Sequence, residues 1–444
     1  MGSPDAEDAV DRDREGGLGR ERRSLRVLFA VSDWPGHWHA MVPLGWALRA
    51  AGHDVRVVCA PSQTDPLTRA GLTPVPILDG GWDMALQGRL QNYVDARDGQ
   101  WRLPGLPPHP VTGEPLASLD EFDMDAWFTG YHPRLVEAAT GSTDRAVAFG
   151  RAWRPDLVVH ERFSLEGPLV AGVLGVPSAV HLWGPCGPDD SEPGFISLPL
   201  DFSGAFDRHG LPPLTARTFT HVIDPSPADV APPLLTAERM PVRYVPYNGP
   251  GSAPRELPGP SERPRVCVVW GTSVTRMYGQ DSFAVPEILA GLADLDAEVV
   301  VAVTGADRER LGTVPPNARV VGHTPLHLLL PSCDAVVHHG GAGVVMTSLA
   351  AGVPQLAVSH GLDQAVNARR VTVAGAGRVV EAHLAERGAV TAAVAELLGE
   401  PAVRAAALRL RRQVMDNPSP ARLATALGRL AARPPALATA RGGN

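Results

Sequence analysis

Residues 336–352 read Val-Val-His-His-Gly-Gly-Ala-Gly-Val-Val-Met-Thr-Ser-Leu-Ala-Ala-Gly. The pattern predicts a buried strand, a tight glycine-rich turn, and a helix over residues 342–351 that Gly352 and Pro354 end. Backbone N–H groups at the beginning of a helix have no partner within it, and the helix dipole adds partial positive charge there. The stretch therefore predicts a binding site for a phosphate or a diphosphate.

The glycines of this turn allow the backbone to approach a ligand closely. The residues expected to line the anion site are His339, Gly341, Ala342, Gly343 and Val344. Among them, His339 could add a hydrogen bond or a positive charge. No Gly-Lys-Ser/Thr follows the glycines, and the spacing is not Gly-x-Gly-x-x-Gly, so the turn is neither a P-loop nor a clean dinucleotide fingerprint. A turn that only packs a strand against a helix remains the alternative.

Short apolar runs on both sides of this stretch alternate with helical patterns. The strands predicted in the C-terminal half are 265–270, 298–303, 319–321, 334–338, 355–359 and 378–380. Those predicted in the N-terminal half are 26–31, 55–59, 156–160 and 178–183. Unbroken apolar strands joined by helices indicate parallel sheets covered on both faces. Since 444 residues exceed one hydrophobic core, we expect an α/β fold with two Rossmann-like, doubly wound domains facing across a cleft.

Composition shifts suggest where the domains begin and end. Residues 1–23, rich in Asp, Glu, Arg and Gly, predict a disordered tail. We expect the first domain over residues 24–246 and a linker rich in Pro and Gly over 247–264. The second domain is expected over 265–415, and residues 416–444 are expected to form a helix that packs back on the first domain, followed by a tail.

The charge, the apolar runs and the cysteines exclude several classes of protein. The formal net charge is −8, without a basic block, which excludes a nucleic-acid partner. No uninterrupted apolar run reaches the length of a membrane span, so no membrane partner is expected. Four scattered cysteines without Cys-x-x-Cys spacing indicate buried thiols in a reducing, cytoplasmic environment.

Two titratable residues stand at predicted strand ends in the N-terminal half. The loop after the first strand reads Ser-Asp-Trp-Pro-Gly-His-Trp-His and offers His37 as a general base, with His39 as its competitor. Glu161 follows another strand and could orient and stabilise a charged imidazole. The alternatives are a histidine that caps a helix or contacts solvent, and a surface pair of Glu161 with Arg162.

The C-terminal half offers further polar groups at strand ends. Thr272 and Ser273 could hold phosphate oxygens or a nucleoside. The loop expected to flank a nucleobase contains His323, Thr324, Pro325 and Leu326. Asp363 and Gln364 suit sugar hydroxyls, although a helix cap is the alternative for this pair.

The stretch from residue 79 to 121 is irregular and rich in Trp, Gly and Pro, which is typical of a functional loop or lid. The tryptophans expected to line an acceptor pocket are Trp34, Trp38, Trp82 and Trp127, with Trp101 as a further candidate; core packing is the alternative. Asp123-Met124-Asp125 has the spelling of a metal-binding Asp-x-Asp motif, but its acidic surroundings indicate a helix start. We therefore expect no metal and no cofactor.

Four motifs together carry a family resemblance. They are Gly-His-Trp-His-Ala-Met-Val-Pro-Leu from residue 36, Val-Pro-Tyr-Asn-Gly from 245, Val-Gly-His-Thr-Pro-Leu-His-Leu-Leu-Leu-Pro from 321, and His-His-Gly-Gly-Ala-Gly from 338. The combination resembles actinobacterial antibiotic glycosyltransferases of the GT-B fold, of the erythromycin desosaminyltransferase type. The resemblance runs from about residue 26 to about residue 430, nearly the whole chain.

The resemblance implies a deoxysugar transfer from a dTDP-sugar, bound by the second domain, to a hydroxyl of a polyketide-like, hydrophobic aglycone bound by the first. It also implies inversion at the anomeric carbon. Motif by motif, His37 takes the position of the base, His339 that of the diphosphate-binding histidine, and Asp363 with Gln364 that of the donor-sugar pair. The chain departs from the family at two positions. Val344 stands where many relatives have Ser or Thr, and Glu161 where many have Asp.

Some relatives need a haem-protein-like activator, so such a helper is an expected partner. A homodimer is a separate expectation. Three alternative functions remain open from the sequence. They are C-glycosylation of an aromatic aglycone, a nucleotide-sugar epimerase, and a non-catalytic nucleotide-sugar-binding partner. The loop containing His37 and the long aromatic insertion argue against the epimerase, and the pair His37 and His339 argues against the non-catalytic protein.

Overall fold

The computed structural model describes residues 23–79, 83–192, 197–253, 259, 261–322 and 324–432. Trp82 and His323, both predicted site residues, lie outside the described residues, as do residues 1–22 of the predicted tail. The predicted linker and the end of the chain are described only in part. No helix among the described residues is long and apolar enough to cross a membrane.

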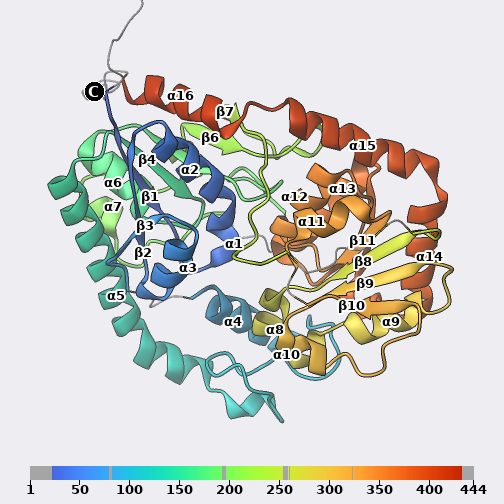
Figure 1. The fold of residues 1–444 in the computed structure, drawn as a ribbon. Helices are drawn as coiled ribbons and strands as arrows, with labels where there is room; N and C mark the ends of the chain where they lie inside the picture. Colours follow the sequence, from blue (N-terminus) through green and yellow to red (C-terminus); the bar gives the residue numbers. More distant parts are fainter. Residues whose placement is uncertain are drawn as a thin grey trace, which may run out of the picture.

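Two parallel sheets form the two lobes of the molecule (Figure 1). The N-terminal sheet has the order β3-β2-β1-β4-β5-β6-β7. Its strands are β1 (Arg26–Ala30), β2 (Asp54–Cys59), β3 (Thr73–Pro76), β4 (Leu157–Glu161), β5 (Ser178–His181), β6 (His221–Asp224) and β7 (Glu238–Pro241). Its helices are α1 (Pro35–Trp38), α2 (Val42–Ala50), α3 (Thr64–Arg69), α4 (Met84–Arg97), α5 (Met124–Trp153), α6 (Glu166–Leu174) and α7 (Ala205–Arg208).

The C-terminal sheet has the order β10-β9-β8-β11-β12-β13. Its strands are β8 (Arg265–Val269), β9 (Glu298–Ala302), β10 (Ala318–Val320), β11 (Ala335–His338), β12 (Gln355–Ser359) and β13 (Gly377–Glu381). The helices that follow β8 are α8 (Thr272–Tyr278), α9 (Val285–Leu292), α10 (Gly305–Glu309), α11 (Leu326–Leu329), α12 (Ala342–Ala351), α13 (Leu362–Val373), α14 (Arg387–Gly399), α15 (Pro401–Asp416) and α16 (Pro420–Ala431). Two parallel, doubly wound α/β sheets confirm the predicted fold class.

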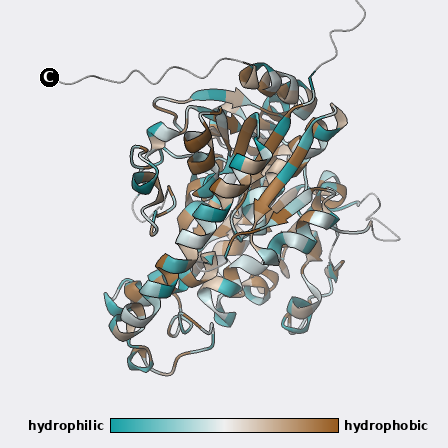
Figure 2. Ribbon diagram, turned by 90° about the vertical axis from the view of Figure 1, so that its left-hand side faces the viewer, coloured by the Kyte–Doolittle hydropathy of each residue, from teal (hydrophilic) through white to brown (hydrophobic). Residues whose placement is uncertain are grey.

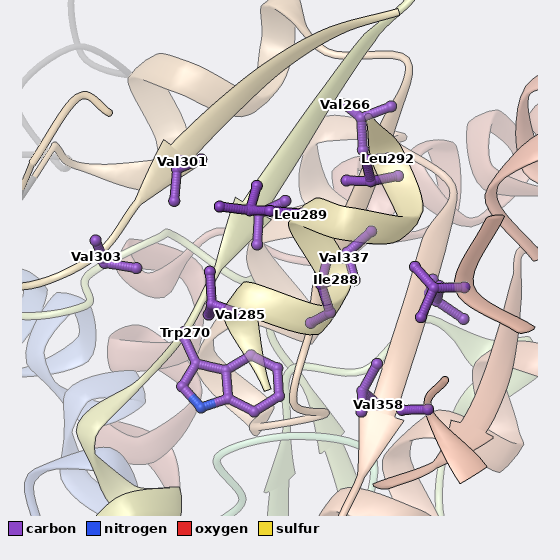
Figure 3. Close-up of a cluster of buried hydrophobic side chains, with 14 of the residues drawn as sticks. Val266, Trp270, Val285, Ile288, Leu289, Leu292, Val301, Val303, Val337 and Val358 are labelled. Atoms are coloured by element: carbon purple, nitrogen blue, oxygen red, sulfur yellow. The ribbon is translucent and has the colours of Figure 1, made fainter. Parts of the chain in front are cut away.

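The side chains of successive residues in each strand point to opposite faces of the sheet. Phe29 of β1 packs in one core together with α2 and α16, whereas Leu28 packs in another with α5 and α6. In the C-terminal lobe, α9 covers one face, with Ile288 and Leu289 against Val301 and Val337 (Figure 3). The strands are mostly hydrophobic, while the helices in front of them alternate in character (Figure 2). Burial on both faces explains why the strands read as unbroken apolar runs.

The last two helices connect the lobes. Helix α15 packs on α12 of the C-terminal lobe, and α16 packs on α2 of the N-terminal lobe. Figure 1 shows this pair as a red band that crosses from one lobe to the other. Leu423 and Leu427 belong to the same core cluster as Phe29. Helices α15 and α16 therefore connect the two lobes.

The structure differs from the sequence prediction in the stretch from residue 79 to 121, which contains the 14-residue helix α4. The Asp83 side chain caps this helix by accepting from the Leu86 N–H. Arg89 and Asn92 are among its buried residues, so the helix lacks a continuous apolar stripe. Strands β3, β6 and β7 were also missed: β3 and β7 contain no fully buried residue, and the apolar residues of β6 are two, between His221 and Asp224.

Candidate active site

A cleft of about 390 Å³ lies between the lobes, beyond the carboxyl ends of their strands. Its lining comes from both lobes. Among the predicted site residues, those that line it are Trp34, His37, Thr272, Ser273, Leu326, His339, Gly341, Ala342, Gly343, Val344, Asp363 and Gln364. Residues far apart in the sequence thus line one cavity.

His37 stands on the short helix α1, just after β1, and its side chain is buried. Its Nδ1 lies 3.2 Å from the Ser32 hydroxyl and 3.6 Å from Oε2 of Glu161. Burial, reinforced by the Arg162 charge, holds the His37 pKa well below its usual value. The imidazole is therefore neutral at physiological pH, with Nε2 available as a proton acceptor when the proton resides on Nδ1.

Glu161 is the last residue of β4, and its carboxylate is fixed by backbone donors. Oε1 accepts from the Ser32 N–H at 2.9 Å, and Oε2 accepts from the Phe163 N–H at 2.7 Å. Burial raises its pKa to about 7, against the effect of these hydrogen bonds and of Arg162. The carboxylate is thus held beside His37 at a pKa that lets it titrate near neutral pH.

The alternative of a surface pair between Arg162 and Glu161 is wrong, because both side chains are buried. Arg162 is only 1% exposed. Its Nη1 donates to the Gly187 carbonyl at 3.1 Å, and its guanidinium lies 4.5 Å from the ring centre of Trp183. Arg162 also lines the cleft, so it contributes a buried positive charge to the site.

Trp183, just after β5, was not predicted as a site residue. The His37 and Trp183 rings stack with centroids 4.0 Å apart and planes inclined by 10°. Phe163 lies near both rings, with centroids at 5.5 and 5.8 Å. The sequence offered a buried aromatic at a strand end, but no pattern that would pair it with His37.

The glycine turn and helix α12 have the predicted form. The first intrahelical bond runs from the Val345 N–H to the Gly341 carbonyl. The N–H groups of Ala342, Gly343 and Val344 therefore have no partner within the helix. A Cβ at Gly343 would come within 2.7 Å of the Asn248 Oδ1. Asn248 lines the cleft from the predicted linker and is a second residue that the sequence reasoning missed.

His339 lies between two glycines. Its Nδ1 accepts from the Gly271 N–H at 3.4 Å, which leaves Nε2 to carry the proton. A Cβ at Gly341 would lie 2.4 Å from that Nε2, and one at Gly271 would lie 2.8 Å from the imidazole Cε1. Burial, together with His338 and His360, lowers the His339 pKa to about 3. The ring is therefore a neutral hydrogen-bond donor rather than the positive charge that was also considered.

Asp363 and Gln364 lie in the first turn of α13, whose N-cap is Gly361. The N-cap residue is thus neither member of the pair, although the Gln364 Oε1 accepts from the His360 N–H at 3.4 Å just before the helix. The preceding residue, Leu362, has a positive φ of 53°, which is a strained backbone for a leucine. Burial raises the pKa of Asp363, and its carboxyl group faces the cleft. The strained start of α13 thus turns two polar side chains toward the cavity.

Two of the predicted acceptor tryptophans do not line the cleft. Trp38 is 1% exposed, and its indole N–H donates to the Gln63 Oε1 at 3.0 Å. Trp127 stacks on Tyr131 near the beginning of α5. Trp34 does line the cleft, beneath the Arg276 guanidinium. Sequence spacing could not separate these cases, because Trp34 and Trp38 are four residues apart but pack in different hydrophobic clusters.

The predicted nucleobase loop is described at Thr324, Pro325 and Leu326. The Thr324 hydroxyl donates to the Val321 carbonyl, and Pro325 is the N-cap of α11. Leu326 is the member of this group that lines the cleft. The loop therefore borders the cavity mainly through one apolar side chain.

Helix α4 of the N-terminal lobe reaches the C-terminal lobe, and we refer to it as the arm. Arg89 of α4 donates to the Arg276 carbonyl at 3.0 Å, and Asn92 donates to the Met277 carbonyl at 2.8 Å. Both carbonyls belong to the last turn of α8. Thr272 and Ser273 begin the same helix at the cleft. The arm therefore fixes the far end of a helix whose near end lines the cavity.

The Asp123-Met124-Asp125 motif begins a helix, as expected. Asp123 is the N-cap of α5, and its carboxylate accepts from the Ala126 N–H at 2.9 Å. Within the described ranges, no group of three or more His, Cys, Asp or Glu side chains could hold a metal ion.

Comparisons with known proteins identify related chains. Residues 127–271 and 286–430 match the profiles "Erythromycin biosynthesis protein CIII-like" for the N-terminal and C-terminal domain, respectively. The 10-deoxymethynolide desosaminyltransferase of Streptomyces venezuelae is 35% identical over 440 residues, covering 93% of this chain and 99% of the relative. The aklavinone 7-beta-L-rhodosaminyltransferase of Streptomyces galilaeus is 35% identical, covering 92% and 96%. The structure of the glycosyltransferase VinC in complex with dTDP superposes with a TM-score of 0.68 at 27% identity, covering 92% and 99%.

Proposed function

The chain belongs to the erythromycin biosynthesis protein CIII-like family of glycosyltransferases, and from this membership we propose a dTDP-deoxysugar donor and a hydroxyl acceptor on a polyketide-like aglycone. The fold is GT-B, and the enzyme transfers a sugar in antibiotic biosynthesis. The transfer inverts the anomeric carbon, and the diphosphate is held by protein groups alone.

One observation carries this proposal: His37 and His339 line the same cleft, one from each lobe. A neutral imidazole beside a carboxylate suits a general base. A helix N-terminus with free N–H groups beside a neutral histidine suits a leaving diphosphate. A sugar bound between them has the attacking oxygen and the leaving group on opposite sides, which supports inversion.

The step proceeds as follows. His37 removes the acceptor hydroxyl proton while the oxygen forms a bond to C1 of the donor sugar. The bond between C1 and the diphosphate oxygen breaks, and its electron pair leaves with dTDP. Glu161 stabilises the imidazolium that forms. The N–H groups of residues 342–344 and the His339 Nε2–H stabilise the charge that grows on the diphosphate.

The donor sugar is assigned to Asp363 and Gln364, and Thr272 and Ser273 are assigned to the phosphate side. The acceptor body is assigned to a second hollow of about 140 Å³ in the N-terminal lobe. This hollow shares Met84, Gln87 and Phe163 with the cleft, so the two cavities adjoin. We refer to it as the acceptor hollow.

Product analysis tests the proposal. The protein is mixed with dTDP-deoxysugars and with 10-deoxymethynolide or aklavinone, the aglycones in the relatives' names. We expect a glycoside of the opposite anomeric configuration and release of dTDP. The His37→Ala variant should be slower by about 100- to 10,000-fold. Equal dTDP release by the variant and the wild type would contradict the assignment of His37, and a retained configuration would contradict inversion.

A further inference from the structure

The acceptor hollow lies directly beside the base. Ser32, whose hydroxyl contacts His37, and Phe163, whose ring lies near His37, both form part of its wall. Much of the remaining wall is apolar and includes Leu78, Leu135 and Leu165. A molecule in this hollow therefore has one end near the base and the rest against hydrocarbon.

Glu166 interrupts this apolar wall. It stands in the first turn of α6, and its side chain lines the hollow. Its carboxylate accepts from the Ser164 hydroxyl at 3.4 Å and from its own backbone N–H. Among the described residues, none forms an ion pair with it. Burial raises its pKa, because it disfavours the charged form.

The other two carboxylates that line the hollow have stronger partners than Glu166 has. Asp33 accepts from the Gln63 side-chain amide at 2.6 Å and from the Ser62 hydroxyl. Asp79 pairs with the Arg145 guanidinium. Glu166 accepts from the Ser164 hydroxyl and from its own N–H, whereas a carboxylate can accept about four hydrogen bonds. Its unused acceptor capacity faces the hollow.

We propose that Glu166 selects acceptors that present a hydrogen-bond donor, a hydroxyl or an ammonium group, to this part of the hollow. The inference rests on the proposed function, because it takes the hollow as the acceptor site. Glu166 is only partly exposed, and a carboxylate shielded from water that lacks a donor is costly, so an acceptor without the donor is disfavoured. Glu166 would then act on specificity and not on the chemical step.

Aglycone binding to the full chain tests the inference. Dissociation constants for 10-deoxymethynolide and aklavinone are measured by calorimetry with dTDP present. Glu166→Leu and Glu166→Met both remove the hydrogen-bond-accepting carboxylate. If one variant does not fold, the other alone serves as the test. We expect both to weaken the binding of at least one aglycone by about 10- to 100-fold. The dTDP affinity should stay within about twofold, since Glu166 lies outside the donor site.

Glu166→Gln tests the hydroxyl donor, since both aglycones are neutral and carry no ammonium group. Its amide oxygen still accepts from a hydroxyl, so affinity within about threefold of wild type is expected, whereas a loss as large as in Glu166→Leu would contradict a hydrogen bond from a hydroxyl. Asp125→Leu, which removes an exposed first-turn carboxylate from α5, is the matched control. Unchanged aglycone affinity in Glu166→Leu and Glu166→Met overturns the inference alone. If the wild type binds dTDP but neither aglycone, the acceptor hollow itself is misassigned and the proposed function fails with it.

Discussion

The imidazole of His37 lies flat against the indole of Trp183, with ring centroids 4.0 Å apart. Trp183 follows β5 and belongs to a cluster with Ala342 of α12 and Val366 of α13. It therefore contacts the base on one lobe and the helices of the donor side on the other. An aromatic face also stabilises a cation, which the base becomes during proton transfer.

Replacing Trp183 by Leu should lower kcat by about 100-fold, because the ring that orients His37 is lost. The donor KM should rise as well, since Trp183 packs with Ala342 and Val366 on the donor side and contacts the Asp363 carboxyl group. Trp183→Phe keeps a flat ring and should retain most activity. Steady-state kinetics of both variants check this.

Trp153→Leu controls for the loss of a large buried ring. Trp153 is buried in the N-terminal core and stacks on Phe149, away from the cleft. The Trp153→Leu variant should be less stable than the wild type, but its folded fraction should keep the wild-type kcat. If Trp183→Leu and Trp153→Leu lower kcat alike, Trp183 has no special role toward His37.

The rate should rise with pH around neutrality. Burial raises the Glu161 pKa to about 7, so raising the pH through that value converts the carboxyl group into the carboxylate that supports the imidazolium. The His37 pKa is lowered, so His37 already stays neutral over this range. A profile of kcat/KM against pH should therefore have an ascending limb near 7.

In Glu161→Gln this limb should disappear, and the rate should fall by about 100-fold. The amide keeps the size of the side chain but cannot carry charge. A limb that persists in Glu161→Gln would assign the titration to another group.

The arm formed by α4 should support the donor site from a distance. Arg89→Ala combined with Asn92→Ala removes the donors to the last turn of α8, and each lost buried hydrogen bond costs about 1–3 kcal/mol. We expect a lower melting temperature and a weaker dTDP affinity. Arg97→Ala is the control on the same helix, because its partner Asp120 is exposed. Unchanged dTDP affinity in the double variant would show that the arm stabilises the lobes without shaping the donor site.

Gly341 should tolerate no side chain. A Cβ there would lie 2.4 Å from the His339 Nε2, so Gly341→Ala forces the imidazole away from the turn. We expect dTDP affinity to fall by about tenfold or more, the loss of about one charge-assisted hydrogen bond. Gly388→Ala is the matched control, because nothing lies within 4 Å of its added Cβ. Wild-type affinity in Gly341→Ala, measured by calorimetry, would contradict the placement of the diphosphate.

Much of the fold could be predicted because strands buried on both faces produce continuous apolar runs, and because Gly352 marks the end of α12. Helix α4 could not be predicted, because buried polar residues such as Arg89 interrupt its apolar stripe. His37 and Glu161 could be predicted because each stands at the end of a predicted strand. No local pattern shows which aromatic ring contacts His37. The pairing with Trp183 depends on how β1, β4 and β5 lie side by side, a property of the whole sheet.

A crystal structure of the protein with thymidine diphosphate tests the central claim most directly. The account predicts the β-phosphate at the beginning of α12, with oxygens on the N–H groups of residues 342–344 and on the His339 Nε2, opposite His37. A diphosphate bound elsewhere in the molecule, away from His339, would contradict it.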